Sequence, residues 1–342
     1  MKRALLVAFI SLVFAFAAQS GGGGEARNTI TRKVSISVRP MDLTAIPSDA
    51  ESHHRTKWSR DLYIYIDDDV VSPSIFVFDR NGKQVYNSLL QIPGVDRMRV
   101  EDFESAPDHT LWLCGNSHSP SGQASYFLAH ITNDGQDVHF VQTAPYHANQ
   151  ISVAPDGTVW SAGFELVPGA PHDSNDRAKL NDNADTLRHY DGGGKLLASA
   201  VPTTAVGDKI RIVNGVLRAT QDRVGWYATN ANYMEFSPDL KVQTSFPPAP
   251  AISQRHKVEG FVLTPSGKSF LVVTHSSPTG RVATLYQLDQ VTRAWVEIDS
   301  HQLGFDVLPM LQGNDGESLV FMGPPDKSKL QIINISSTVT NQ

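Results

Sequence analysis

Beyond residue 30 the chain is a succession of short apolar or alternating runs, separated by Gly, Asn, Asp and Pro. Alternation with a period of two is typical of strands that bury one face, whereas an amphipathic helix needs apolar residues at i, i+3, i+4 and i+7. The runs lack a sustained helical spacing. The pattern therefore predicts an all-β protein built from many short strands with tight turns.

These runs are also similar to one another. Residues 154–160 (Ala-Pro-Asp-Gly-Thr-Val-Trp) read as a strand end, a turn at Asp-Gly and a second strand with a large apolar residue. Turn residues at the tip and apolar residues on both sides predict a β-hairpin. The related segments are residues 106–112 and 264–270, with weaker copies at 221–226 and 314–319.

A second hairpin pattern follows the first, and residues 186–197 carry its clearest copy. Its relatives are residues 75–85, 127–136, 233–241 and 285–290. The two hairpins together make four antiparallel strands, which is one blade of a β-propeller.

Six repeats are counted from the large apolar residue on the second strand of each one. These anchors are Ile64, Trp112, Trp160, Trp226, Phe270 and Leu319. They are evenly spaced, except that an insertion at residues 167–185 lengthens the interval after Trp160. We therefore expect a six-bladed β-propeller with four-stranded antiparallel blades.

The last repeat ends after three strands, at residues 307–312, 318–322 and 329–334. Residues 32–38 alternate polar and apolar positions ahead of the first repeat. We expect this N-terminal strand to complete the last blade and close the ring, because closure removes exposed sheet edges. The polar segment at residues 51–58 predicts an irregular first blade.

The Asp-Gly-x-Val-Trp element ending at Trp160 and the Tyr-Asp-x-x-Gly-Lys element starting at Tyr190 resemble those of six-bladed propellers of the NHL-repeat and gluconolactonase-like type. The resemblance implies this architecture for nearly the whole chain after residue 30. Propellers of this shape serve as binding platforms, hydrolases, lyases and oxidoreductases, so it does not select one reaction.

The N-terminus has the pattern of an export signal. A basic start is followed by an apolar run over residues 4–18, in which Ala15 and Ala17 suit a cleavage site. We expect residues 1–18 to be a signal peptide, residues 19–29 a flexible linker and residues 30–342 the propeller. This organisation predicts a periplasmic or secreted bacterial protein with no membrane span in the mature chain.

Composition narrows the classes of partner. The 342 residues include 29 basic and 35 acidic ones, for a net charge of −6, which argues against a nucleic-acid binder. Cys114 is the single cysteine, so an intrachain disulfide and a cysteine zinc cluster are excluded. We expect a monomer with a small molecule or a protein as its partner.

In a propeller, the loops between second and third strands and the loops between blades share one face, called the top face here. The candidate ligand-binding residues are those expected in these loops and strand ends. They are Asn116, His118, Glu165, His172, Asn230 and His275. The insertion also falls in such a loop.

Glu101, Asn149 and Glu259 occupy equivalent positions on the first strands of three repeats. The same spacing places Gly215 and Leu308 at this position in two other repeats. The gluconolactonase-like resemblance implies a divalent cation at the channel mouth, and oxygen ligands from several blades suit a hard cation. The alternative is that these polar groups are simply solvated in the channel.

His147, His256 and Arg99 are the candidate catalytic residues, since imidazole titrates near neutral pH. A nucleophile elbow of the Gly-x-Ser-x-Gly type is missing from the sequence. The favoured hypothesis is an exported propeller that binds a ligand or protein through its top face. The alternative is a metal-dependent lactonase-type hydrolase or lyase at the channel mouth, so enzymatic activity is left open.

Overall fold

The computed structural model describes residues 12–14, 28–40, 54–68, 71–167, 180–206, 216–228, 233–241, 243–247, 256–277, 280–298, 308, 310–323 and 326–341. Among these residues, almost all regular structure is β-strand, with one short helix, α1 (Thr203–Val206). The candidate residues His172 and Asn230 lie outside the described residues, as do most of the expected export signal and linker.

Five sheets are four-stranded antiparallel blades, numbered I to V in chain order. Blade I holds β3 (His54–Ser59), β4 (Leu62–Asp67), β5 (Ser74–Phe78) and β6 (Gln84–Leu89). Blade II holds β7 (Arg97–Ser105), β8 (Leu111–His118), β9 (Ala124–Ile131) and β10 (Val138–Gln142). Blade III holds β11 (Tyr146–Val153), β12 (Val159–Glu165), β13 (Asp185–Tyr190) and β14 (Leu196–Pro202).

The next two blades come from the C-terminal half. Blade IV holds β15 (Val216–Ala219), β16 (Val224–Tyr227), β17 (Tyr233–Phe236) and β18 (Gln243–Phe246). Blade V holds β19 (His256–Leu263), β20 (Ser269–Ser277), β21 (Gly280–Asp289) and β22 (Ala294–Ile298). In every blade the strand order follows the chain, as a series of hairpins requires.

The remaining sheet, called the terminal sheet here, departs from the expectation of six four-stranded blades. Its five strands are β1 (Leu12–Phe14), β2 (Asn28–Pro40), β25 (Asp326–Asn341), β24 (Ser318–Gly323) and β23 (Met310–Asp315), in that order. There are thus five four-stranded blades rather than six. The count differs because the long strand β2, after pairing with β25, also carries β1 on its other edge.

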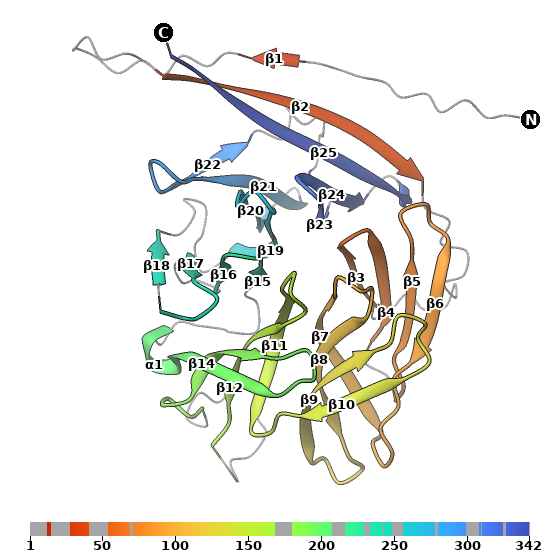
Figure 1. Ribbon diagram of the computed structural model, residues 1–342. Helices are drawn as coiled ribbons and strands as arrows, with labels where there is room; N and C mark the ends of the chain where they lie inside the picture. Colours follow the sequence, from red (N-terminus) through yellow and green to blue (C-terminus); the bar gives the residue numbers. More distant parts are fainter. Residues whose placement is uncertain are drawn as a thin grey trace, which may run out of the picture.

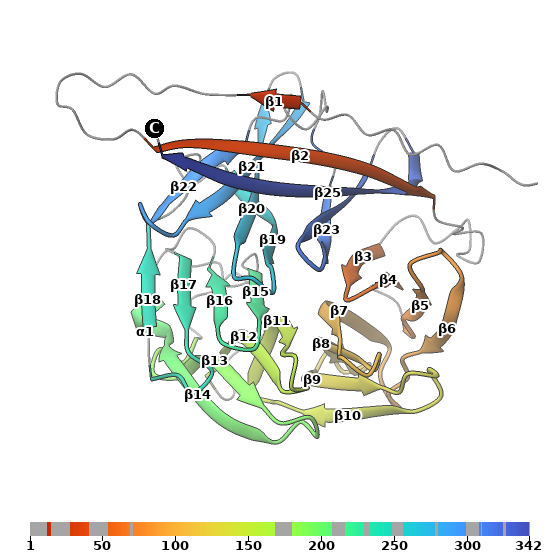
Figure 2. The ribbon, with the colours of Figure 1, turned by 45° about the horizontal axis from the view of Figure 1, so that its top comes forward.

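The first strands of blades I to V lie toward the centre of the molecule, and their last strands lie at its rim (Figures 1 and 2). β23 of the terminal sheet contacts both β19 and β3. Its sheet also packs on blade I, since Val320 and Met322 share a buried apolar cluster with Trp58 and Tyr63. This packing buries the apolar faces that each sheet would otherwise expose to water.

Five of the six anchors predicted from the sequence lie on the second strands of blades I to V, in β4, β8, β12, β16 and β20, and the sixth lies on β24, next to β23 in the terminal sheet. Each is at most 2% exposed. A large apolar side chain at this position fills the space between neighbouring sheets, which explains why the sequence repeats it. Burying one such side chain stabilises a fold by about 1.5–3 kcal/mol.

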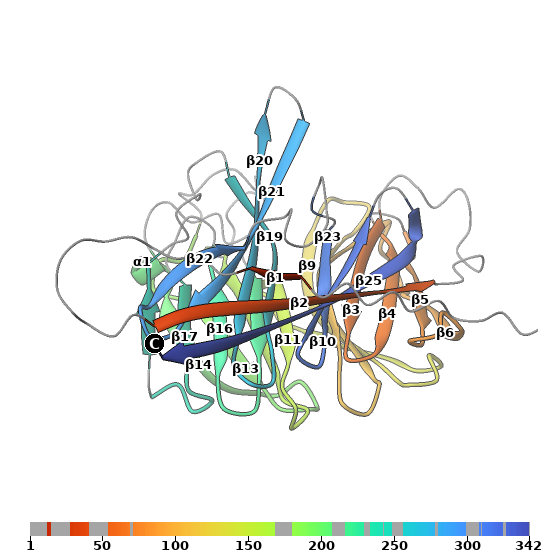
Figure 3. The ribbon, with the colours of Figure 1, turned by 90° about the horizontal axis from the view of Figure 1, so that it is seen from above.

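The repeated Asp-Gly turns have a local cause. The Oδ1 atom of Asp156 accepts hydrogen bonds from the amide and the hydroxyl of Thr158, and Gly157 has a φ of +84°. This aspartate-capped turn needs a residue that tolerates positive φ. Asp108 and Thr110 repeat the contact in blade II. Turns of this kind gather on one side of the molecule (Figure 3).

Four of the central strands carry a β-bulge, in β7, β11, β19 and β23. A bulge leaves one extra residue unpaired and redirects its side chain. The four extra residues are Glu101, Asn149, Glu259 and Gln312. The predicted metal candidates are therefore the bulge residues of three strands.

The fourth bulge residue corrects one expectation from the sequence, which placed Leu308 at this position. Gln312 holds it instead, because β23 and β24 are joined by the tight turn at Gly316 and Glu317. The corresponding turn in blade II uses all of residues 106–110. A fixed spacing back from the anchor Leu319 therefore overshoots the bulge.

Two glycines make room for the bulges. A Cβ atom on Gly115 would lie 2.2 Å from the carbonyl oxygen of Arg99, and one on Gly163 would lie 2.1 Å from that of His147. Real Cβ atoms do not approach a carbonyl oxygen this closely. The strands opposite these two bulges thus require glycine because the backbones nearly touch.

Candidate functional site

The candidate site is centred on the end of β7 and β8 in blade II that faces away from the Asp-Gly turns. Arg97 lies directly opposite His118, and Arg99 lies opposite Asn116. Residues that face each other across an antiparallel pair share one side of the sheet, as do residues two apart along a strand. The four side chains therefore form one continuous row of N–H donors on one side of the blade.

Glu101 lies at the inner end of this row and is nearly buried, with 8% of its side chain exposed. Its Oε1 atom accepts a hydrogen bond from Asn116 Nδ2 at 3.1 Å, and Arg99 Nε is 3.3 Å from the same oxygen. A second guanidinium, that of Arg55, lies 3.6 Å from Oε2. Burial raises the pKa of Glu101, although Arg99 and Arg55 act in the opposite direction.

His147, from blade III, packs against the same cluster. Its ring stacks on Tyr126 at 4.4 Å between centroids and meets the edge of Phe164 at 5.0 Å. Its Nε2 atom lies 3.4 Å from Asn116 Nδ2 and 3.9 Å from Glu101 Oε1. Burial, with the nearby charges of Arg99 and His118, lowers the pKa of His147 to about 3. The imidazole is therefore neutral near pH 7 and is a weak base there.

Arg55 and Asp68 fix blade I to this site. Arg55 Nε donates to Asp68 Oδ2 at 2.8 Å, and its Nη1 donates to the carbonyl oxygen of Glu101 at 2.9 Å. Asp68 Oδ1 accepts from the amide of Val100 at 2.7 Å. These charge-assisted contacts hold the bulge of β7 in place from the neighbouring blade.

A second group of charges lies farther along the central strands. Lys57 Nζ donates to Asp102 Oδ1 at 2.9 Å, and Asp102 Oδ2 accepts from the amide of Ile151 at 3.0 Å. Burial alone would raise the pKa of Asp102, but Lys57 and Arg218 outweigh it, so the pKa is lowered. Blades I, II and III are thus joined through one carboxylate.

Arg218 and Glu104 extend this group. Arg218 Nη1, from blade IV, lies 3.9 Å from Glu104 Oε2 in blade II. Their strands β15 and β7 are not neighbours, because β11 lies between them and contacts both. The ion pair therefore reaches across the central space of the molecule, below the level of Glu101.

The remaining bulge residues have different surroundings. Asn149 is 5% exposed, and neither its amide oxygen nor its nitrogen has a hydrogen-bond partner among the described residues. Gln312 is also 5% exposed, and its Oε1 atom is likewise unpartnered there. Glu259 Oε1 accepts from Thr274 Oγ1 at 2.9 Å. Buried polar groups without partners are uncommon in folded proteins, so Asn149 and Gln312 call for an explanation.

The fit of a divalent cation to these residues is uneven. Within the described part of the chain, no three His, Cys, Asp or Glu side chains are grouped as a metal site. Glu101 already faces two guanidinium groups, so a cation at this carboxylate has to displace at least one of them. Asn149, Gln312 and Glu259 supply oxygen atoms of the kind that hard cations prefer.

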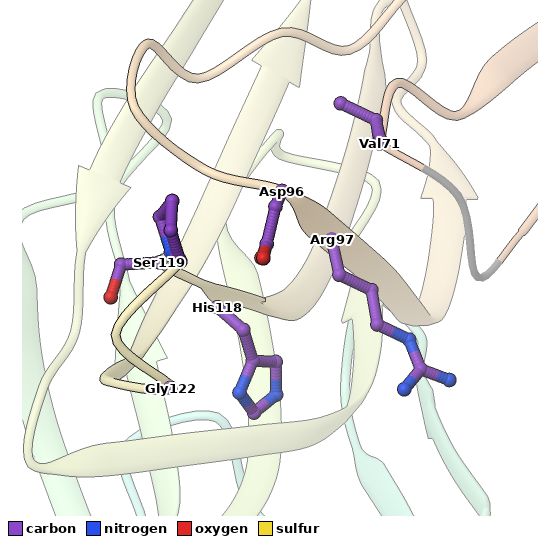
Figure 4. A pocket seen from close by; sticks show the side chains of 7 residues that line it. Val71, Asp96, Arg97, His118, Ser119 and Gly122 are labelled. Carbon is purple, nitrogen blue, oxygen red and sulfur yellow. The ribbon is translucent and has the colours of Figure 1, made fainter.

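A pocket of about 500 Å³ opens beside the donor row, at the outer end of β7 and β8. It is lined by Val71, Asp96, Arg97, His118, Ser119, Pro120 and Gly122. Figure 4 shows His118 and Arg97 projecting from the paired strand ends, with Asp96 and Ser119 beside them. His118 lies two residues from Asn116 along β8, and Asn116 donates to Glu101, so the pocket and the Glu101 cluster belong to one region.

Other predicted site residues lie elsewhere. Glu165 forms an ion pair with Arg188 and accepts a hydrogen bond from Asn181 Nδ2 at 3.1 Å, so internal contacts occupy this carboxylate. His256 and His275 lie opposite each other on β19 and β20 in blade V. The hairpin formed by β20 and β21 rises above the other strands in Figure 3. The structure thus brings together Arg99, Glu101, Asn116, His118 and His147 among the candidates.

The sequence analysis did not select Arg55, Asp68 or Tyr126. Asp68 lies in a run of three aspartates, and the sequence does not show which of the three accepts hydrogen bonds from Arg55 and Val100. Arg55 is on the polar first strand, whose strand pairing the pattern barely predicts. The sequence does carry one signal of the bulges. Gly115 and Gly163 each lie three residues after the anchor tryptophan of their repeat, opposite a bulge.

No protein-family model matches the sequence. No curated protein matches it either. Among solved structures, the chain is similar to lignostilbene dioxygenase from Pseudomonas brassicacearum, with 11% identity, 78% of this chain and 70% of that chain covered, and a TM-score of 0.46. The NHL-repeat and gluconolactonase-like assignment therefore stays a prediction, while the four-stranded antiparallel blades of the structure confirm the β-propeller fold.

Two further solved structures are similar in the same way. A luciferin-regenerating enzyme has 10% identity, with 90% of this chain and 97% of that chain covered, and a TM-score of 0.47. YCF48 bound to D1 peptide has 14% identity, with 74% and 71% covered, and a TM-score of 0.40. At these identities the likeness concerns the fold alone.

None of the described helices has the length and apolar character needed to cross a membrane.

The environment of His147 predicts how the fold responds to acid. Because its pKa is about 3 in the folded chain and about 6.5 when unfolded, the unfolded state takes up a proton first as the pH falls. This contribution to stability is complete above about pH 6.5 and is lost toward pH 3. Between pH 7 and pH 4, wild type should lose about 3 kcal/mol more than His147→Phe in urea unfolding.

The exposed His139 supplies the matched control, since His139→Phe changes the same residue type outside the cluster. We expect this variant to lose stability with pH as wild type does. Equal acid sensitivity of wild type and His147→Phe would show that His147 is not held neutral by burial.

Proposed function

We propose that this chain is an exported β-propeller that binds a small polar ligand on the top face of blade II. The observation that carries the proposal is the row of donors formed by Arg97, Arg99, Asn116 and His118 beside a pocket. Aligned N–H donors suit a ligand with oxygen acceptors, and guanidinium groups favour a carboxylate or a phosphate.

The surroundings support a preformed site. The carboxylate of Glu101 holds Asn116 and Arg99 in place, and Arg55 and Asp68 fix the strand beneath them. Arg99 keeps 49% of its side chain exposed, so it can contact a ligand from solvent. Side chains held by internal contacts lose little conformational entropy on binding, which favours affinity.

The neutral imidazole of His147 is more consistent with positioning than with proton transfer at pH 7. A general base is most effective when its pKa lies near the working pH, and a pKa of about 3 is far from neutrality. Tyr126 and Phe164 also pack against its ring. A binding role is therefore preferred to a catalytic role for this residue.

The proposal takes the terminal sheet as a sixth blade, with β2 as the strand that completes it and closes the ring. The full-length pairing of β2 with β25 and the contacts of β23 with β3 and β19 support this reading. A closed ring would hold blades I to III at fixed angles, which the contacts of Arg55 and Asp102 across these blades need.

Replacement of Arg99 tests the binding site. Succinate serves as the probe because its carboxylates match the donor row. Loss of one charge-assisted hydrogen bond costs about 1.5–3 kcal/mol, so Arg99→Gln should raise the dissociation constant of succinate at least about tenfold in calorimetric titration. The melting temperature should change little, since the side chain is half exposed.

Arg80→Gln is the control for that experiment. Arg80 has 50% of its side chain exposed and pairs with Asp315 at 3.5 Å, away from blade II's donor row. This variant should bind succinate as wild type does. Equal affinities of wild type and Arg99→Gln for succinate would remove Arg99 from the site, and failure of succinate to bind wild type would contradict the proposal.

Export is tested by the N-terminus of the mature chain. Expression of the full sequence in a bacterium should give a periplasmic protein whose first residue follows the small residues Ala15 and Ala17, as N-terminal sequencing would detect. Replacing both alanines with Leu should block processing. An unprocessed cytoplasmic chain in the wild-type culture would contradict the export proposal.

A metal-dependent lactonase-type hydrolase or lyase is the second candidate function. The buried and unpartnered amide oxygens of Asn149 and Gln312 favour it, because both lie at bulges of the central strands. A divalent cation held by them and Glu259 would supply a Lewis acid for a carbonyl oxygen. Arg99 and His118 would then orient the substrate by hydrogen bonds from the top face.

Metal analysis decides between the two candidates. If the second is correct, the purified chain should contain about one divalent ion per molecule by elemental mass spectrometry, and chelation should lower its melting temperature. Asn149→Leu should remove both the ion and the effect of the chelator. A metal-free protein with an unchanged melt after chelation would leave the binding site as the function.

A further inference from the structure

The pocket beside the donor row differs from the rest of the site because it contains both signs of charge. Asp96 contributes a carboxylate, while Arg97 and His118 contribute nitrogen donors. Elsewhere in the row, the carboxylate of Glu101 is nearly buried and already engaged by Asn116. Asp96, in contrast, is exposed and lines the pocket itself.

Backbone geometry places these three residues next to one another at the mouth of the pocket. Asp96 and Arg97 are consecutive, so their Cα atoms are about 3.8 Å apart. Arg97 pairs directly with His118, and the amide of Asp96 donates to the carbonyl oxygen of His118 at 3.0 Å. Paired residues in an antiparallel sheet have Cα atoms about 4.5–5.5 Å apart. The acid and the two bases therefore lie within the span of one small ligand.

The rest of the lining completes a small, half-apolar site. Ser119 adds a hydroxyl group, and its amide is tied to the carbonyl oxygen of Gln123 at 2.9 Å, which orders the loop. Val71 and Pro120 supply apolar surface. The volume of about 500 Å³ falls in the range of small-molecule sites. Figure 4 shows Asp96 between Ser119 and Arg97, with the His118 ring below it.

We propose that this pocket binds a zwitterion, with a free α-amino acid as its ligand class. Its ammonium group would donate to Asp96, and its carboxylate would accept from His118 and Arg97. The Ser119 hydroxyl already contacts that of Ser121 at 2.8 Å and accepts from the amide of Gln123 at 3.2 Å, so it shapes the wall of the pocket. Val71 and Pro120 would contact an apolar side chain. This inference rests on the proposed function, because it names the ligand class of the same top-face site.

Charge matching at both ends distinguishes this ligand from a simple anion. A carboxylate without an ammonium group would bring a second negative charge toward Asp96 and gain nothing from it. An amine without a carboxylate would lose the contacts with His118 and Arg97. Like charges held close together are unfavourable, so each half-ligand should bind more weakly than the whole.

L-Leucine and its two truncated analogues test the inference on the full mature chain. Calorimetric titration should give L-leucine a dissociation constant at least about tenfold lower than that of 4-methylpentanoate, which lacks the amino group. The same should hold against 3-methylbutylamine, which lacks the carboxylate. An L-leucine affinity no better than that of 4-methylpentanoate would overturn the inference.

Asp96→Asn removes the negative charge of the pocket and leaves Arg97 and His118 in place. The substitution keeps the shape of the side chain and the hydrogen bond from the residue 96 amide to the carbonyl oxygen of His118. It should raise the dissociation constant of L-leucine at least about tenfold and should not raise that of 4-methylpentanoate. The matched control is Asp137→Asn, another exposed aspartate, which should leave both affinities unchanged. An L-leucine affinity unaffected by Asp96→Asn would also overturn the inference.

The outcomes distinguish this inference from the proposed function. If succinate binds through Arg99 but L-leucine does not bind, the top-face binding site stands and only the zwitterion inference fails. If neither succinate nor L-leucine binds to the wild-type chain, both fail together. Binding of both succinate and L-leucine to the wild-type chain, with loss of L-leucine binding on Asp96→Asn, supports both.

Discussion

The bulge in the central strand of blade II is the constraint on which the candidate site depends. An extra residue in β7 places Glu101 where the strand would otherwise continue its ladder, and Gly115 provides the room for it. Arg55 and Asp68 hold the displaced backbone from blade I. Without this bulge, Glu101 could not meet Asn116 and Arg99, and the row of donors would lose its inner support.

Charge balance then determines what the site can accept. Two guanidiniums surround the carboxylate of Glu101, while burial favours its neutral form. His147 is neutral beside it. A site of this kind keeps its donors in position without presenting a strong base. The acidic net charge of the whole chain, −6, therefore does not describe the local charge of blade II, where two arginines line the proposed binding site.

Periodicity predicted most of the fold because the same packing problem recurs in each sheet. Every repeat needs a large apolar residue on its second strand, so Trp112, Trp160 and Trp226 reveal the blades directly. The site is less visible, because its contacts join residues from separate blades that no spacing connects. Arg55 meets Glu101 across two sheets, and nothing near it in the sequence marks that role. The turn between β23 and β24 is also shorter than the turn between β7 and β8, so a fixed spacing pointed to Leu308 where the bulge residue is Gln312.

The terminal sheet draws on both ends of the chain, and this has a consequence for biosynthesis. β2 is made early, yet its partner β25 ends only at Asn341. Strands so distant in sequence pair slowly, because closing the long loop between them costs conformational entropy before their contacts form. An incomplete nascent chain cannot form this sheet. A chain that stops before β25 should thus leave β2 without its partner strand, and β25 must be synthesised before the terminal sheet can form.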